Sequence, residues 1–136
     1  MCNVYDVDER YYLVDLPGYG YVNASKTVRR DLSSLLKRYL WERTRLAGVV
    51  WLLDVRRDPS PDDLEMGALI AERGLPALVA ITKADKFGRG RRGQRTQAIL
   101  GAVQIPADQC VVTSAQTKDG IQDLRDSLQM FVVQQD

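Results

Sequence analysis

The pattern of apolar and polar positions predicts strands alternating with helices. Short runs rich in Val, Tyr, Leu and Ile predict strands at 3–7, 11–15, 48–54, 77–81 and 110–113. Longer segments with apolar residues three or four positions apart predict helices at 25–46, 60–73, 92–103 and 121–132. The polar turn Asp8-Glu9-Arg10 joins the first two strands into a hairpin.

Local signals fix several ends of these elements. Ser60 can cap a helix whose first turn holds Pro61, and Asp63 can complete a capping box. Gly74 is a natural end for that helix, and Gly48 is one for the helix before it. The segment 49–54 is a continuous apolar run up to its final Asp, which is typical of a strand covered on both faces.

This order of elements predicts an α/β fold with a mostly parallel sheet, helices on both faces and an antiparallel hairpin at one edge. Ligands of such sheets bind beyond the carboxyl ends of the strands. Asp15, Asp54, the segment 82–85 and Ser114 all lie at such ends. We therefore expect a functional site at this rim of the sheet.

Composition narrows the class of protein. The chain has 136 residues, a length that predicts one domain, and a net charge of +1, which favours neither a DNA nor a membrane partner. It has no His, which excludes His-based catalysis, and its two cysteines form no metal-binding pattern. No apolar run reaches membrane-spanning length and the first residues do not resemble a signal peptide, so the expected location is the cytoplasm.

The segment Thr82-Lys83-Ala84-Asp85 directly follows a predicted buried strand. A carboxylate held there can accept two hydrogen bonds from guanine, one from the ring N–H and one from the exocyclic amine. Adenine offers no such pair of donors, and a site that leaves a buried carboxylate unpaired rejects the wrong base strongly. Taken alone, the segment is equally consistent with a solvated loop between a strand and a helix.

Two further segments strengthen the guanine hypothesis. Thr113-Ser114-Ala115 follows the last predicted strand, where a backbone N–H could donate to the guanine carbonyl. Asp15-Leu16-Pro17-Gly18 ends the second strand, where proteins that bind Mg-nucleotide place an Asp. Each segment is a weak signal alone, but the three together in this order are specific.

The chain resembles the EngB family of ribosome-biogenesis GTP-binding proteins, a member of the translation-factor-like GTPases. The run specific to that family is DLPGYGY, present here from Asp15 to Tyr21 and followed by Val22 where the family usually has Ala. The TKADK motif is present from Thr82 to Lys86. The closing pattern is matched by Ser114, Ala115, Gly120, Ile121 and Leu124.

This resemblance implies the three-layer G domain of small P-loop GTPases, GTP or GDP as ligand, and Mg²⁺. Asp15 would hold Mg²⁺ through a water, and the Gly18 N–H would face the γ-phosphate. Asp85 would recognise guanine beside the Lys83 stem. The pocket would be completed by neighbouring residues of the three motifs: Leu16, Pro17, Thr82, Ala84, Thr113, Ser114 and Ala115. Tyr19 replaces the water-orienting Gln of many small GTPases, so slow hydrolysis is implied.

The main departure from the family is the phosphate-binding loop. The 136 residues contain no GxxxxGK[ST] sequence and no Gly-Lys pair, and the first switch is also missing. We therefore expect a partial G domain, residues 1–136, without the first strand and P-loop helix. Hydrogen bonds to charged groups contribute ~1.5–3 kcal/mol each. Because ~4 kcal/mol separates micromolar from millimolar affinity, weak GTP binding and no hydrolysis by this chain alone are expected.

Basic residues suggest the partner. A Gly/Arg loop before the third helix carries Arg89, Arg91 and Arg92, and the first long helix carries a further set: Lys26, Arg29, Arg30, Lys37, Arg38, Arg43 and Arg45. Such groups could bind phosphates of ribosomal RNA, in keeping with the role in large-subunit assembly and cell division that the resemblance implies. A solvated charged surface is the alternative explanation.

Two other interpretations stay open: a nucleotide-independent RNA- or ribosome-binding module on a degenerate G-domain fold, and an unrelated doubly wound protein with chance motifs. The missing strand has its own consequence, because the resemblance places it between the strands at 11–15 and 49–54. Unpaired strand edges recruit other strands, so we expect a dimer through that gap, or a fold of poor cooperativity.

Overall fold

The computed structural model describes residues 3–16 and 25–133, so Pro17, Gly18 and Tyr19 lie outside the described residues. The chain divides into two compact units, Met1–Arg45 and Leu46–Asp136, which are described separately below.

The first unit opens with the predicted hairpin. Strand β1 (Asn3–Val7) pairs antiparallel with β2 (Tyr11–Asp15), with Asn3 opposite Asp15. The turn has two successive left-handed residues, Asp8 and Glu9, and is closed by the Arg10 N–H, which donates to the Val7 carbonyl at 2.9 Å. Both strands therefore have the predicted bounds.

Helix α1 (Lys26–Glu42) completes the first unit and is shorter than predicted. Ser25 caps it, since its hydroxyl accepts from the Val28 N–H at 3.2 Å. The predicted end at residue 46 is wrong, because the backbone becomes extended at Arg43. The buried stripe of the helix ends at Leu40, so another turn would gain no buried apolar contact until Leu46.

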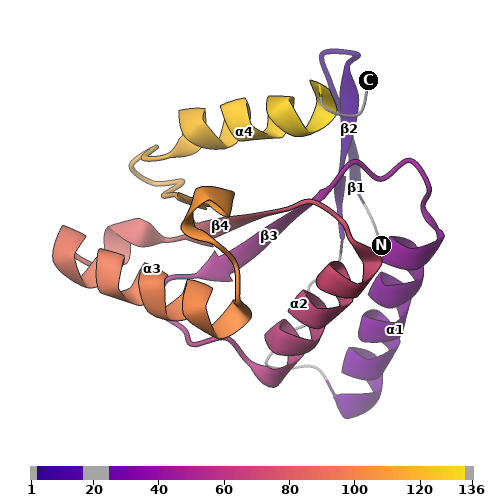
Figure 1. The fold of residues 1–136 in the computed structure, drawn as a ribbon, viewed down its shortest axis with the longest axis horizontal. Helices are drawn as coiled ribbons and strands as arrows, with labels where there is room; N and C mark the ends of the chain where they lie inside the picture. The colour runs from indigo at the N-terminus through magenta and orange to yellow at the C-terminus, as the bar shows by residue number, and fades with distance from the viewer. Residues whose placement is uncertain (1–2, 17–24, 134–136) are drawn as a thin grey trace. The chain divides into compact units, whose positions relative to one another are not determined.

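The second unit is a three-stranded parallel sheet with helices on both faces. Its strands β3 (Val49–Asp54), β4 (Ala77–Thr82) and β5 (Cys110–Val112) lie in the order β3-β4-β5. Helix α4 (Ile121–Val133) lies on one face, and α2 (Pro61–Arg73) and α3 (Arg89–Val103) lie on the other (Figure 1). The expected α/β class with a parallel sheet and an antiparallel hairpin is confirmed.

The core of this unit centres on β4, whose residues Val79, Ala80 and Ile81 are fully buried. Strand β3 differs from the prediction that it is covered on both faces. Trp51 and Leu53 are buried toward the α2 side, but Leu52 on the opposite face is 63% exposed. The apolar run could not reveal this, because hydrophobicity shows a preference for burial and not whether a covering element is present.

Helix boundaries show which local signals decided the structure. Helix α2 has the predicted capping box between Ser60 and Asp63, and it ends at Gly74 in the left-handed conformation. Helix α3 begins at Arg89, three residues before the predicted start, so the expected Gly/Arg loop is the first turn of a helix. Each helical Gly costs about 1 kcal/mol relative to Ala, but burial of the α3 residues Ile99, Leu100 and Val103 outweighs that cost.

In the described residues the hairpin and the parallel sheet are separate sheets, and β3 pairs with β4 alone. None of the helices in the described ranges is both long enough and apolar enough to span a membrane.

Candidate functional site: two polar loops at the carboxyl ends of the parallel strands

Two loops that follow neighbouring parallel strands are joined by hydrogen bonds. The loop after β4 contains Ala84, whose N–H donates to the Thr113 carbonyl after β5 at 3.1 Å. Thr113 is also bonded to β4. Its N–H and its hydroxyl both donate to the Ile81 carbonyl, at 2.7 and 3.0 Å. The segments 82–85 and 113–115 therefore form one surface, as expected for loops at the same rim of a sheet.

The side chains of Asp85 and Ser114 meet on this surface. The buried Ser114 hydroxyl donates to Asp85 Oδ1 at 2.7 Å and accepts from the Thr117 N–H at 3.1 Å, so it is held from both sides. The Ser114 hydrogen bond is the largest cause that lowers the pKa of Asp85 below its usual value. Asp85 is therefore ionised at neutral pH, and each of its oxygens keeps acceptor capacity.

In the loop after β5, the backbone N–H of Ser114 is bonded within the loop and that of Ala115 is not. The Ser114 N–H donates to the Asp119 carbonyl at 3.0 Å, which closes the loop before α4. The Ala115 N–H has no acceptor among the described residues. Of the Ser114 and Ala115 N–H groups, that of Ala115 is thus the one that a ligand can use.

Lys83 has an unusual backbone. Its φ and ψ of 59° and 35° are left-handed, which is uncommon for a residue other than Gly. It precedes a short 3-10 helix, Ala84–Lys86, in which the Lys86 N–H donates back to the Lys83 carbonyl at 3.0 Å. Strained residues of this kind cluster at ligand sites, and this one turns the chain directly into Asp85.

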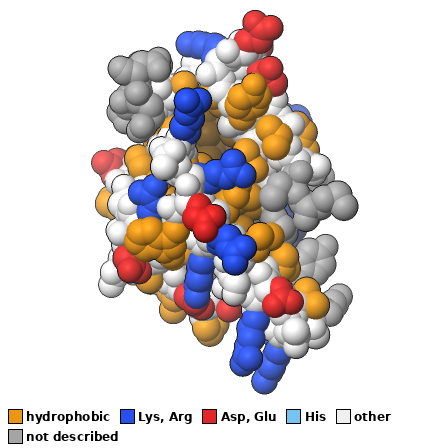
Figure 2. All heavy atoms as spheres, turned by 90° about the vertical axis from the view of Figure 1, so that its right-hand side faces the viewer, with side chains coloured by type: hydrophobic (Ala, Val, Ile, Leu, Met, Phe, Trp, Pro, Cys, Tyr) orange, Lys and Arg blue, Asp and Glu red, His pale blue; other side chains and the backbone are white. Residues whose placement is uncertain are grey.

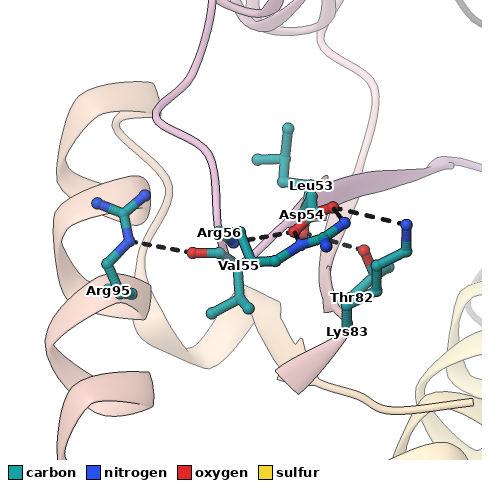
Figure 3. A network of polar contacts seen from close by, with 7 residues as sticks. All are labelled: Leu53, Asp54, Val55, Arg56, Thr82, Lys83 and Arg95. Carbon is teal, nitrogen blue, oxygen red and sulfur yellow. Dashed lines mark hydrogen bonds and ion pairs between the residues drawn. The ribbon is translucent and has the colours of Figure 1, made fainter. Parts of the chain in front are cut away.

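A carboxylate on the same rim of the sheet binds two cationic side chains (Figure 3). Asp54, the last residue of β3, accepts from Arg56 Nε at 3.1 Å and from Arg56 Nη2 at 2.8 Å. Lys83 Nζ lies 3.7 Å from Asp54 Oδ2. The Arg56 hydrogen bond is the largest cause that lowers the pKa of Asp54 to about 2.

The same turn is connected to α3. The Val55 N–H donates to the Thr82 carbonyl at 3.0 Å, which extends the β3–β4 ladder past Asp54. The Val55 carbonyl accepts from Arg95 Nε at 3.0 Å (Figure 3). The sequence placed Asp54 at a strand end but did not predict these contacts; the signal available was an Arg two residues after an Asp at a strand end.

The expected Mg²⁺ residue lies in the first unit. Asp15 is exposed at the end of β2 and Leu16 follows it half-buried. Within residues 3–16 and 25–133, no group of three His, Cys, Asp or Glu side chains could hold a metal ion. Mg²⁺ takes oxygen ligands in near-octahedral geometry, so Asp15 alone does not constitute a magnesium site.

The basic cluster at the start of α3 is partly paired. Arg92 lies 3.8 Å from Asp119, Arg95 lies 2.7 Å from Asp58, and Arg91 stacks on Phe87 with 4.4 Å to the ring centroid. These acids come from distant parts of the sequence, so the sequence alone does not show that Arg92 and Arg95 are paired. Figure 2 shows one face on which basic, acidic and hydrophobic side chains are intermixed.

Comparisons with known proteins show which proteins the chain is similar to. No protein-family model matches the chain. The chain is 36% identical over 130 residues to a probable GTP-binding protein EngB of Desulfitobacterium hafniense, covering 95% of this chain and 65% of that protein. The chain thus spans less than two thirds of that relative's length.

Solved structures share the fold. The crystal structure of a probable GTP-binding protein engB matches with a TM-score of 0.80 at 18% identity, over 90% of this chain and 77% of that one. Era, in a complex with MgGDPNP and nucleotides 1506–1542 of 16S ribosomal RNA, matches with a TM-score of 0.68 at 18% identity, over 96% and 43% of the two chains. The fold is therefore that of a small-GTPase G domain.

Proposed function

The chain belongs to the EngB family of GTP-binding proteins, and from this premise we propose that the pocket of residues 82–85 and 113–115 recognises the guanine base of GTP or GDP. The observation that carries the proposal is the bond between Ser114 Oγ and Asp85 Oδ1 at 2.7 Å. It links two motifs from different parts of the chain and holds one carboxylate at the rim.

The chemistry of recognition follows from the donors and acceptors. Asp85 is ionised and accepts from the guanine ring N–H and the exocyclic amine, while the Ala115 N–H donates to the guanine carbonyl. Adenine presents an acceptor where guanine presents the ring N–H, so its binding would leave Asp85 without that partner. The Lys83 stem would lie along the base.

In the longer EngB proteins we propose that this pocket is used with a phosphate-binding loop and Mg²⁺, neither of which residues 1–136 supply. The sequence has no GxxxxGK[ST] motif. Loss of several phosphate contacts, each worth ~1.5–3 kcal/mol, leaves a dissociation constant above ~1 mM for GDP and no hydrolysis of GTP by this chain alone.

The test is titration of the 136-residue chain with GDP and with ADP, followed by NMR chemical shifts. We expect GDP to shift signals of the loops after β4 and β5 at millimolar concentration, with weaker effects of ADP. Asp85→Ala should remove the preference, and Asp108→Ala, which removes an exposed carboxylate elsewhere in the same unit, should keep it. Equal binding of ADP would overturn base recognition, and micromolar GDP binding would overturn the weak-affinity proposal.

We also propose ribosomal RNA of the large subunit as the partner, in keeping with ribosome assembly. The first turn of α3 has three Arg residues and no acid, and Era, of similar fold, was solved with nucleotides of 16S ribosomal RNA. These observations support an RNA partner, and the choice of the large subunit rests on the family resemblance. A function as an RNA-binding module that needs no nucleotide is the competing proposal. It would be favoured if RNA affinity is the same with and without saturating GDP.

A further inference from the structure

Two cationic side chains lie near the proposed base pocket, where they could occupy the Asp85 carboxylate in place of guanine. Arg56 and Lys83 both lie against Asp54, on the same rim as Asp85. A guanidinium binds a carboxylate through two parallel N–H donors, the same pattern that guanine presents with its ring N–H and amine. Arg56 is therefore a competitor for the oxygens that the base must reach.

We propose that Asp54 is a positioning residue of the base pocket, which holds Arg56 away from Asp85 so that the Asp85 carboxylate remains open to guanine. This inference rests on the proposed function and adds a role for a residue outside the GTPase motifs.

The geometry at Asp54 is suited to restraining Arg56. Asp54 Oδ1 accepts from the Arg56 backbone N–H at 2.9 Å as well as from Nε at 3.1 Å, and Oδ2 accepts from Nη2 at 2.8 Å. The Arg57 N–H closes the turn on the Asp54 carbonyl at 3.2 Å. Among the described residues, Asp54 supplies every hydrogen bond of the Arg56 guanidinium.

Loss of the Asp54 charge would free both cations, and the charge of Arg56 already acts on Asp85. The side chain of Arg56 is 39% exposed and that of Lys83 is 56% exposed, so both have room to reorient. The charge of Asp85 already contributes to the raised pKa of Arg56, after the larger effect of the hydrogen bond to Asp54. Lys86 also acts on Asp85, but it belongs to the same short helix and does not depend on Asp54.

Three variants test the proposal: Asp54→Asn, Arg56→Gln and the double variant. GDP titration of each uses the same NMR signals. An exposed ion pair changes an equilibrium by up to a factor of about 5, so Asp54→Asn should weaken GDP binding by about that factor. The double variant should recover affinity to within about twofold, because the competing guanidinium is absent. Arg56→Gln alone should bind GDP like the original chain.

A second measurement needs no nucleotide. The pKa of Asp85, followed through its carboxyl ¹³C signal, should be lower in Asp54→Asn than in the double variant, because only the double variant lacks the freed Arg56 charge. Equal pKa values in those two variants would overturn the proposal, as would an affinity loss that the double variant does not recover. Lost GDP binding in Arg56→Gln would also overturn it, and that test remains if Asp54→Asn does not fold. Absence of a GDP preference in the original chain would overturn the proposed function, while the pKa comparison would still decide this inference.

Discussion

Asp54 should make the free energy of unfolding decrease at low pH, because its carboxylate is bonded to Arg56 in the folded state. Its hydrogen bonds with Arg56 lower its pKa from 3.8 to about 2 in the folded state. A carboxyl with a lowered folded pKa stabilises the fold above its unfolded pKa, and this contribution is lost as the pH falls through the folded pKa. The difference between the folded and unfolded pKa values corresponds to a contribution of at most about 2.4 kcal/mol to the free energy of unfolding. The contribution is smaller than this limit because the Asp54 side chain is 20% exposed and solvent screens part of the interaction.

The prediction is that Asp54→Asn lowers the free energy of unfolding at pH 7 by up to about 2.4 kcal/mol, and that this difference disappears as the pH falls from 3.8 to 2. Urea unfolding at several pH values measures it. Trp51 is buried in the second unit, so its fluorescence in a Trp41→Phe background reports on that unit. The control Asp108→Asn removes an exposed carboxylate and should change stability by less than about 0.5 kcal/mol. A difference between Asp54→Asn and its parent that is the same at every pH would refute the argument.

Four further predictions concern the fold and the partner. Gly120→Ala should destabilise the second unit by at least about 1–3 kcal/mol, because φ is +72° and the new Cβ would overlap the Val112 carbonyl oxygen. Gly101→Ala, with open space around it in α3, should instead stabilise by about 0.5–1 kcal/mol in the same urea assay. Replacement of Arg89, Arg91 and Arg92 by Ala should reduce the slope of log RNA affinity against log salt concentration by up to ~3 units. An unchanged slope would show that these residues form a solvated surface and do not bind RNA. We expect light scattering to show a dimer, or thermal unfolding to be broad; a monomer with one sharp, concentration-independent transition would contradict this.

Local chemistry was enough to predict several elements. The hairpin has the predicted bounds because two short runs of strand-forming residues flank a short polar turn. Helix α2 was predicted at both ends because a capping box and a terminal Gly act through neighbours three or four residues away. These signals depend on residues close in sequence, so they are visible without the fold.

Other features depended on what the rest of the chain supplies. The end of α1, the start of α3 and the exposure of Leu52 were not predictable, because each reflects whether a distant element offers apolar surface to bury against. Periodicity shows that a segment has an apolar face. It does not show how far along the segment that face is covered.

The candidate site divides in the same way. The sequence alone determined that Asp85 and Ser114 follow strand ends, which parallel strands bring to one rim; that these two strands are neighbours is shown by the structure. Only the tertiary structure showed the 2.7 Å bond between them and the position of Lys83 Nζ 3.7 Å from Asp54. Side-chain contacts between strands depend on register and on the direction in which each loop leaves the sheet. Both are set by packing among residues far apart in sequence, so no local pattern encodes them.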